Sequence, residues 1–418
     1  ITLSWLNPST RLFCLIFCYD PATILQDDEL MPLTTSAYWD IFCTVVDNYG
    51  DIGVTWRLAR QLSREFQQPV RLWVDDLSSF QRLCPTLDPS QPSQQIDNVL
   101  IGHWDTPFPA DWQPGKVVIE AFACELPASV QQTMLNMANP PVWLNLDYLT
   151  AESWIDGCHG LPSRQQHLTR YFFFPGFSEK SGGLLCENDL FAKRDQWQSS
   201  PDHRRQFCQD RDLLPPQADE LFISLFTYEN KALLALLECW LQHQTPIRCL
   251  IPMGKALNSL RTILPDAVCQ PGGRWQQGSL TIEVLPMTDQ DGYDQLLWSC
   301  DFNIVRGEDS FLRAQWAARP FLWHIYPQEE AAHLEKLQAF TARYSQKMSP
   351  ELAVTVQQLF LSFNQEQPAE LQQNWEKLQK QWPEWQQHAH SWPQTALAGG
   401  NLASQLVHFV EKQLECCA

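Results

Sequence analysis

Short apolar segments alternate with helical stripes along most of this chain, and this alternation restricts the possible folds more than any other feature. In the first half, apolar runs typical of buried strands precede segments whose apolar residues recur every three or four positions. A repeated strand–helix order favours a parallel sheet with helices on both faces. The strands predicted in this half are 39–46, 69–76, 99–104, 117–123 and 142–148.

A second series of the same kind follows residue 218. The helix predicted after its first strand has a continuous apolar stripe on one face. This stripe consists of Leu233, Leu236, Leu237, Trp240 and Leu241. Strands are predicted at 221–226, 247–251, 280–285, 301–305 and 321–326, and the chain from 329 onward is predicted to be mostly helical.

The stretch between the two series, residues 178–218, is polar and has no clear period, so we interpret it as a domain linker. The predicted domains are then 38–177 and 219–350, followed by a helical tail at 351–418. Two such halves predict an α/β fold of two Rossmann-like domains that face each other across a cleft. Many nucleotide-sugar enzymes share that architecture, but the fold alone does not define a function.

Composition narrows the classes of partner. The formal net charge of −19 argues against binding to nucleic acid or to anionic membranes, which requires basic patches. The 14 cysteines include no Cys-x-x-Cys pair, which favours reduced, buried thiols in a cytoplasmic protein over a disulfide framework. No apolar stretch has the length of a membrane span. Residues 1–30 differ from the rest of the chain, and we interpret them as a non-native upstream extension before Met31.

The segment 47–53 connects the first predicted strand to the first predicted helix. It contains two carboxylates, Asp47 and Asp51, and two glycines, Gly50 and Gly53. In an open α/β sheet, such loops lie at the carboxyl ends of the strands, where ligands bind. One carboxylate could accept a proton while the other orients a cationic or hydroxylic substrate. The alternative is a tight turn with an aspartate that caps the helix.

A second loop with these properties, residues 306–310, follows a predicted strand in the second half and begins another helix. Free N–H groups at a helix N-terminus and the fixed charge of Arg306 suit a pyrophosphate, and Glu308 could bind a sugar hydroxyl. The alternative is a capped helix beside a surface arginine. A matching loop in each half favours the functional interpretation.

Several common chemistries lack their motifs in this sequence. There is no Gly-x-Gly-x-x-Gly fingerprint, no phosphate-binding P-loop, no Gly-x-Ser-x-Gly elbow and no His-Glu-x-x-His zinc pair. The sequence therefore predicts a reaction that needs no metal, in which a helix dipole and an arginine balance the charge of a leaving diphosphate.

Seven motifs of this sequence together carry a family resemblance. They are 39–43, 46–54, 143–146, 159–163, 172–177, 306–311 and 323–328. They resemble those of one family, the bacterial protein-arginine rhamnosyltransferases of elongation factor P (EarP). The resemblance extends from about residue 38 to the C-terminus. The aromatic segment within it, 171–177, could belong to the core or line an acceptor cleft.

The resemblance implies the two-domain GT-B fold and an inverting, metal-independent transfer. Rhamnose would pass from dTDP-β-L-rhamnose to an arginine of elongation factor P, which supports translation of proline stretches. By motif, Asp51 is the catalytic base, Asp47 its partner, and Glu308 a third necessary carboxylate. The donor-binding residues implied in the same way are Asn48, Tyr49, Gly50, Phe226, Tyr228, Gln290, Tyr293, Arg306, Gly307, Asp309 and Ser310.

A guanidinium is a poor nucleophile, because it stays protonated up to a pH of about 12 and its lone pair is delocalised. We therefore expect Asp47 and Asp51 to bind the guanidinium, localise its lone pair, and accept the proton as the new bond forms. Two other interpretations stay open. One is a GT-B transferase or epimerase that acts on a small molecule, and the other is a non-enzymatic protein whose acidic loops dock a basic partner.

Overall fold

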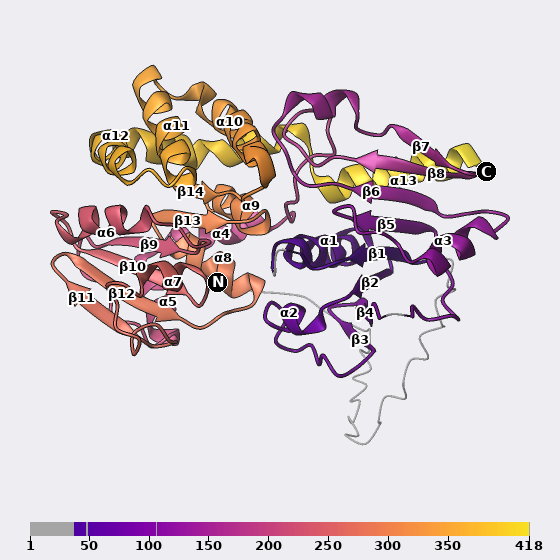
Figure 1. Cartoon of the computed structure of the whole chain (residues 1–418), viewed down its shortest axis with the longest axis horizontal. Coiled ribbons are helices and arrows are strands. Elements are labelled where there is room, and N and C mark those ends of the chain that lie inside the picture. Colours follow the sequence, from indigo (N-terminus) through magenta and orange to yellow (C-terminus); the bar gives the residue numbers. More distant parts are fainter. Residues whose placement is uncertain (1–36, 47–48, 106, 418) are drawn as a thin grey trace, which may run out of the picture. The chain divides into compact units, whose positions relative to one another are not determined.

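The computed structural model describes residues 37–46, 49–105 and 107–417, and these residues belong to one compact unit (Figure 1). The interpretation of residues 1–30 and the roles predicted for Asp47 and Asn48 fall outside the described residues. The predicted domain boundaries remain predictions. For brevity, the first sheet with α1–α3 and α13 is called the first lobe, and the second sheet with α4–α12 is called the second lobe.

The first sheet has eight strands among the described residues, in the order β3-β4-β2-β1-β5-β6-β8-β7. Its central strands pair in parallel, while β3 and β7 add antiparallel edges. All five residues of β1 are buried, as expected for a strand covered on both faces. The strands are β1 (Trp39–Cys43), β2 (Val70–Val74), β3 (Ser93–Ile96), β4 (Val99–His103), β5 (Val117–Ala121), β6 (Val142–Leu146), β7 (Pro162–Gln165) and β8 (Leu168–Phe173).

The second sheet has six strands in the described part of the chain, in the order β11-β12-β10-β9-β13-β14. Only its edge strand β11 pairs antiparallel among these strands. The order steps outward from β9 in both directions, so β9 and β13 meet at a topological switch point, where ligands bind in open α/β sheets. The strands are β9 (Leu221–Leu225), β10 (Ile247–Pro252), β11 (Arg274–Gln277), β12 (Leu280–Leu285), β13 (Phe302–Arg306) and β14 (Phe321–His324).

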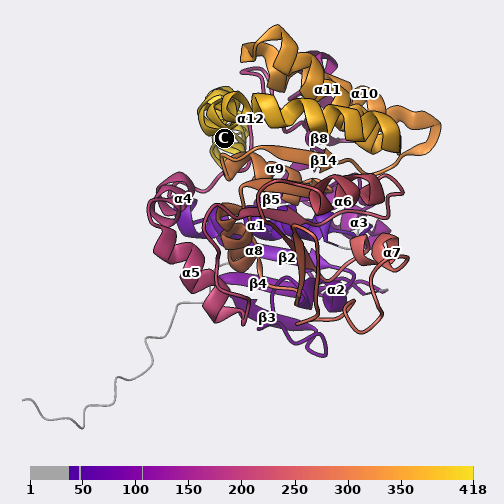
Figure 2. The same ribbon diagram turned by 90° about the vertical axis from the view of Figure 1, so that its left-hand side faces the viewer.

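Helices cover both sheets. In Figure 2, α10, α11 and α12 lie together beyond β14, with α6 close to α12. The helices of the first lobe are α1 (Gly50–Phe66), α2 (Leu77–Gln81), α3 (Ala128–Leu135) and α13 (Leu402–Cys417). Those of the second lobe are α4 (Leu190–Gln198), α5 (Pro201–Asp210), α6 (Leu233–Leu241), α7 (Ala256–Leu260), α8 (Gln290–Ser299), α9 (Asp309–Trp316), α10 (Ala332–Tyr344), α11 (Pro350–Asn364) and α12 (Pro368–Ala396).

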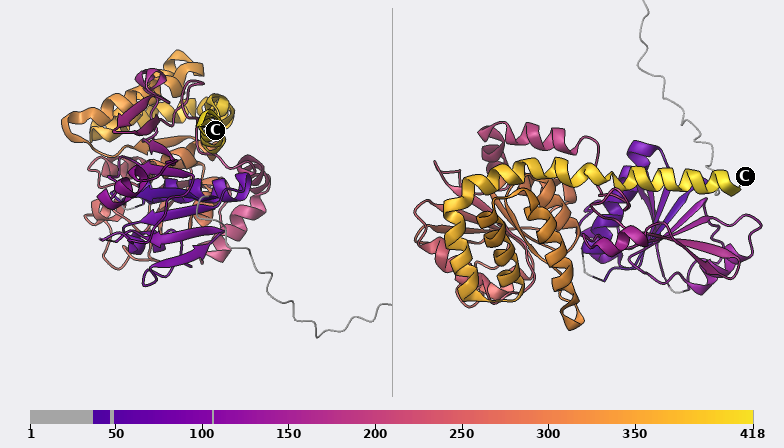
Figure 3. Two further views of the ribbon diagram at one scale, coloured as in Figure 1. Left: turned by 90° about the vertical axis from the view of Figure 1, so that its right-hand side faces the viewer. Right: turned by 90° about the horizontal axis from the view of Figure 1, so that it is seen from above.

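The last helix returns to the first lobe. The right-hand view of Figure 3 shows the chain running from α12 over the second sheet to α13 beside the first sheet. Helix α13 packs against α1 and β6, and it buries a stripe at helical spacing. The stripe consists of Leu402, Ala403, Leu406, Val407 and Val410. The predicted helical tail is therefore present, and its end belongs to the core of the first lobe.

Each strand predicted from the apolar runs is present, but the interpretation of two polar stretches was incomplete. Residues 178–218 contain α4 and α5, which pack against α8. Because α4 buries only Leu190 and Arg194, its sequence has no apolar stripe to reveal it. Similarly, no strand was predicted between 76 and 99, but this stretch contains β3, an edge strand whose residues alternate between exposed and half-buried.

Two further observations concern the chain as a whole. The cysteines among the described residues are unpaired thiols, and most of them are buried. Across the described residues, no helix combines the length and apolar character that crossing a membrane requires.

Candidate active site

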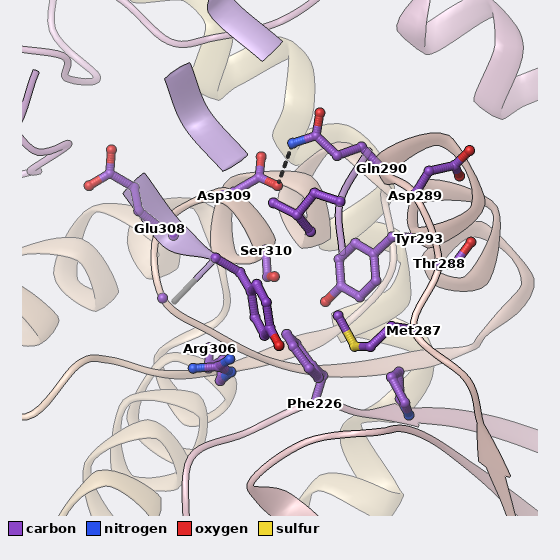
Figure 4. A pocket seen from close by; sticks show the side chains of 15 residues that line it. Phe226, Met287, Thr288, Asp289, Gln290, Tyr293, Arg306, Glu308, Asp309 and Ser310 are labelled. Atoms are coloured by element: carbon purple, nitrogen blue, oxygen red, sulfur yellow. Dashed lines mark hydrogen bonds between the residues drawn. The ribbon is translucent and has the colours of Figure 1, made fainter. Parts of the chain in front are cut away.

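One pocket among the described residues takes its lining from both lobes. The first lobe contributes the start of α1, and the second lobe contributes the ends of β9 and β13 and the starts of α8 and α9. Figure 4 shows the side chains of the second lobe converging on it. Its lining residues are Tyr49, Gly50, Leu83, Phe226, Pro252, Met287, Thr288, Asp289, Gln290, Tyr293, Arg306, Gly307, Glu308, Asp309 and Ser310.

Most of the residues predicted to bind a donor therefore line one pocket. Tyr228 is the exception among the described ones, although its ring centre lies 4.7 Å from the Arg306 guanidinium. Sequence reasoning missed Leu83, Pro252, Met287, Thr288 and Asp289. These residues belong to no recognised sequence motif, and only the fold brings them together around the pocket.

Asp51 lies in the first turn of α1 and is almost fully buried. Its Oδ2 accepts a hydrogen bond from the backbone N–H of Val46 at 2.9 Å, and its Oδ1 accepts one from the Tyr148 hydroxyl at 3.0 Å. The N-cap residue of α1 is Tyr49, whose side chain makes no capping bond. Asp51 is thus not the N-cap of this helix.

Glu308 immediately precedes α9, and its Oε2 accepts a hydrogen bond from the backbone N–H of Leu149 in the first lobe at 3.0 Å. Burial raises the pKa of Glu308 to about 7; the Lys336 ammonium opposes this shift, and the negative charge of Asp51 adds to it. In Figure 4, its carboxylate points away from Met287 and Thr288. A carboxyl group that titrates near neutral pH suits proton transfer.

Arg306, the last residue of β13, is surrounded by aromatic rings. Its guanidinium lies 4.7 Å from the ring centres of both Phe226 and Tyr228, and 5.6 Å from that of Tyr49. Phe226 and Tyr228, both predicted to bind the donor, thus hold the cation beside the pocket. Burial and the charge of Arg306 lower the pKa of the neighbouring His324 to about 3, so this imidazole is neutral.

Arg57 connects the two lobes. It belongs to α1, about two helical turns after the start of this helix at Gly50, and its side chain is 1% exposed. Its Nε donates to Asp309 Oδ1 at 2.8 Å, and its two Nη atoms donate to Asp294 at 3.1 and 3.0 Å. Its Nη2 also donates to the backbone oxygen of Gln290. A single guanidinium therefore ties the helix of Asp51 to α8 and α9 of the second lobe.

Neighbouring groups complete this cluster. Arg313 forms a second bidentate pair with Asp294 and also contacts Glu187, which has its pKa lowered to about 2 because the two arginine charges outweigh its burial. The Gln290 amide donates to the backbone oxygen of Gly53 at 2.8 Å. The start of α1 thus lies directly against the second-lobe side of the pocket.

The search for metal ligands gives a limited result. In the part of the chain that the structure describes, no group of three or more His, Cys, Asp and Glu side chains is arranged to hold a metal ion. The predicted independence from metal remains a prediction.

The comparisons with known proteins agree on one family. A family model described as Elongation-Factor P (EF-P) rhamnosyltransferase EarP matches residues 39–411. A protein-arginine rhamnosyltransferase of Shewanella oneidensis is 51% identical over 390 residues, which cover 91% of this chain and 99% of the relative. The enzyme of the same name from Pseudomonas putida is 48% identical over 384 residues, covering 90% of this chain and all of the relative (100%).

A solved structure gives the same result for the fold. It is described as the structural basis for EarP-mediated arginine glycosylation of translation elongation factor EF-P. It matches with a TM-score of 0.65 and 36% identity, and covers 90% of this chain and 99% of that chain. The predicted α/β fold of the GT-B type is confirmed.

The raised pKa of Glu308 predicts a specific pH dependence of stability. Its folded-state pKa of about 7 exceeds its ordinary value, so the fold favours the protonated form. This contribution is complete at acidic pH and is lost as the pH rises through about 7. We expect the free energy of unfolding of the wild type to fall relative to that of Glu308→Gln between pH 5 and pH 8, as measured by urea denaturation.

The control for this experiment is Glu179→Gln, which alters an exposed carboxylate. Its difference from the wild type is expected to stay constant with pH. A constant difference for Glu308→Gln as well would show that Glu308 is ionised throughout this range.

The Arg57 cluster predicts a large loss of stability on truncation. Arg57→Met leaves the buried Asp309 without its bonded arginine and Asp294 with Arg313 alone, which we expect to cost about 3–5 kcal/mol in the free energy of unfolding. Arg261→Met removes an arginine whose ion pair with Asp266 is exposed, and we expect a cost below ~1 kcal/mol. Urea denaturation measures both values, and equal costs would contradict a structural role of the cluster.

Proposed function

Because the chain belongs to the EarP family of elongation factor P rhamnosyltransferases, we propose that it transfers rhamnose from dTDP-β-L-rhamnose to an arginine of elongation factor P. The chain is a glycosyltransferase, as its relatives are. One observation carries the proposal. An acidic segment of the first lobe and an arginine-containing segment of the second lobe meet around one pocket.

The donor belongs on the second-lobe side of this pocket. Arg306 supplies a fixed positive charge, and the backbone N–H groups at the start of α9 add the favourable end of a helix dipole. Together they suit the diphosphate of the donor and would stabilise it as it leaves. Phe226 and Tyr293, whose ring centres lie 5.8 Å apart, offer aromatic surface for the base of the donor. We propose that this part of the reaction needs no metal.

The acceptor belongs on the first-lobe side. An arginine that enters beside Asp51 would meet a buried carboxylate held by two hydrogen bonds. The guanidinium nitrogen would form a bond to the anomeric carbon while the bond from that carbon to the diphosphate oxygen breaks. As this bond forms, the nitrogen loses its extra proton to a carboxylate. We assign that proton to Asp51, with Asp47 as its partner, and the single displacement inverts the anomeric centre.

Glu308 contacts both sides of the proposed site. It lies in the loop 306–310 of the second lobe, yet it accepts a hydrogen bond from Leu149 in the first lobe, and the charge of Asp51 raises its pKa. A carboxyl group with a pKa of about 7 would exist in both protonation states near neutral pH. It could therefore bond a rhamnose hydroxyl or share the proton released by the acceptor.

The cellular setting follows from the same proposal. A reaction on a translation factor places the chain in the cytoplasm, where modified elongation factor P would support translation of proline stretches. The unpaired cysteines of the described residues are compatible with a reducing compartment. The net charge of −19 is unfavourable for nucleic acid or an anionic membrane as a partner.

The test is to incubate the full chain with dTDP-β-L-rhamnose and elongation factor P of the same organism, and to weigh the factor intact by mass spectrometry. We expect a mass gain of one deoxyhexose. Asp51→Asn should reduce the rate by about 100-fold or more, because it removes the group that accepts the proton. Asp111→Asn, which alters an exposed carboxylate, should leave the rate unchanged.

The outcomes separate the proposal from its two alternatives. Binding of elongation factor P without any mass gain would favour a docking protein. Consumption of the donor without modification of the factor would favour a transferase or epimerase that acts on a small molecule. A normal rate for Asp51→Asn with unchanged donor affinity would remove Asp51 from the chemistry.

A further inference from the structure

Two consecutive residues that follow β6 contact both carboxylates of the site. The Tyr148 hydroxyl donates to Asp51 Oδ1 at 3.0 Å, and the backbone N–H of Leu149 donates to Glu308 Oε2 at 3.0 Å. Asp51 comes from the first lobe and Glu308 from the second. Neither Tyr148 nor Leu149 carries a role in the proposed reaction so far, although both join the groups that do.

The ring of Tyr148 is held firmly in place. It stacks on Phe122, with ring centres 4.6 Å apart and planes inclined by 21°. The ammonium of Lys336 lies 5.6 Å from the centre of the same ring. The hydroxyl therefore points at Asp51 from a fixed position, and the side chain has little freedom to reorient.

The backbone beneath this stack is strained. Phe122 and Ala123, which follow β5, have φ angles of 57° and 54°, a conformation unusual for residues other than glycine. The N–H of Phe122 donates to the oxygen of Leu146 at 2.7 Å, which fixes the stacked ring relative to β6. Such backbone strain is concentrated at functional sites.

Tyr148 stays protonated, so its hydroxyl always acts as a hydrogen-bond donor to Asp51. Burial and the charge of Asp51 raise the pKa of Tyr148 above its usual value, so the hydroxyl keeps its proton at any working pH. A hydrogen bond to a carboxylate favours the ionised form of that carboxylate. With Oδ1 bonded to Tyr148 and Oδ2 to Val46, the plane of the Asp51 carboxylate is fixed.

We propose that Tyr148 is a positioning residue, which keeps the Asp51 carboxylate oriented toward the acceptor guanidinium. This inference rests on the proposed function, and it deepens the description of the acceptor side of that site. An orienting contact matters in this reaction because proton transfer must coincide with the formation of the new carbon–nitrogen bond. A carboxylate free to rotate would meet the guanidinium in the correct geometry less often.

Tyr148→Phe tests this role, because it removes the hydroxyl and retains the stacked ring. We expect kcat to fall by about 10- to 100-fold, whereas KM for the donor stays within about twofold of the wild type. The measurement is the initial rate of rhamnosylation of elongation factor P between pH 5.5 and pH 9.

A matched control is Tyr344→Phe. The Tyr344 hydroxyl is also buried and accepts a hydrogen bond from Trp385 at 3.1 Å, in the second lobe rather than beside a carboxylate. We expect this variant to lose stability without a change in kcat. Thermal unfolding of both variants separates effects on stability from effects on catalysis.

The outcomes are distinct for the inference and for the proposed function. If Tyr148→Phe loses stability but keeps its kcat, the residue is only structural and the inference is wrong. A change confined to KM for the donor would also overturn it. If the wild type itself transfers no rhamnose to elongation factor P, the proposed function fails and this inference fails with it.

Discussion

The buried guanidinium of Arg57 is the interaction on which the candidate site depends. It belongs to the helix that begins at the acidic loop, and its partners Asp294 and Asp309 belong to two helices of the other lobe. Removing such a charge from water is expensive unless every partner is present. All ion pairs of Arg57 with Asp294 and Asp309 therefore form when α1 packs against α8 and α9, as it does here. The positions of Asp51 and of the pocket are set by the same contact.

This arrangement places groups of opposite charge on the two sides of one site. Arg306 lies among Phe226 and Tyr228, where aromatic faces stabilise a cation, while Asp51 is bonded to Val46 and Tyr148. A donor diphosphate and an acceptor guanidinium can then each find a group of opposite charge. Glu308 lies between these two sides, and its burial keeps its pKa near neutral.

Sequence reasoning identified what periodicity and motifs encode, and it missed what only the tertiary structure creates. The central parallel strands were predictable because they are buried on both faces and therefore apolar, as in β1. Strand β3 and helix α4 were missed, since an exposed edge and a polar helix leave no apolar pattern. The loops at 47–53 and 306–310 could be recognised from their position between strand and helix. The partners of Arg57 lie more than 200 residues away, and the bond from Tyr148 to Asp51 depends on packing, so no local pattern predicts either.

The central claim is a division of labour, with the donor bound by the second lobe and the acceptor by the carboxylates of the first. A calorimetric titration of dTDP into the wild type, Arg306→Met and Asp51→Asn tests it most directly. The account predicts that Arg306→Met weakens the affinity for dTDP by about tenfold or more, because it removes the charge opposite the diphosphate. Asp51→Asn should bind dTDP at least as tightly as the wild type. Equal losses of affinity in the two variants would contradict the account, because they would place Asp51 in the donor site.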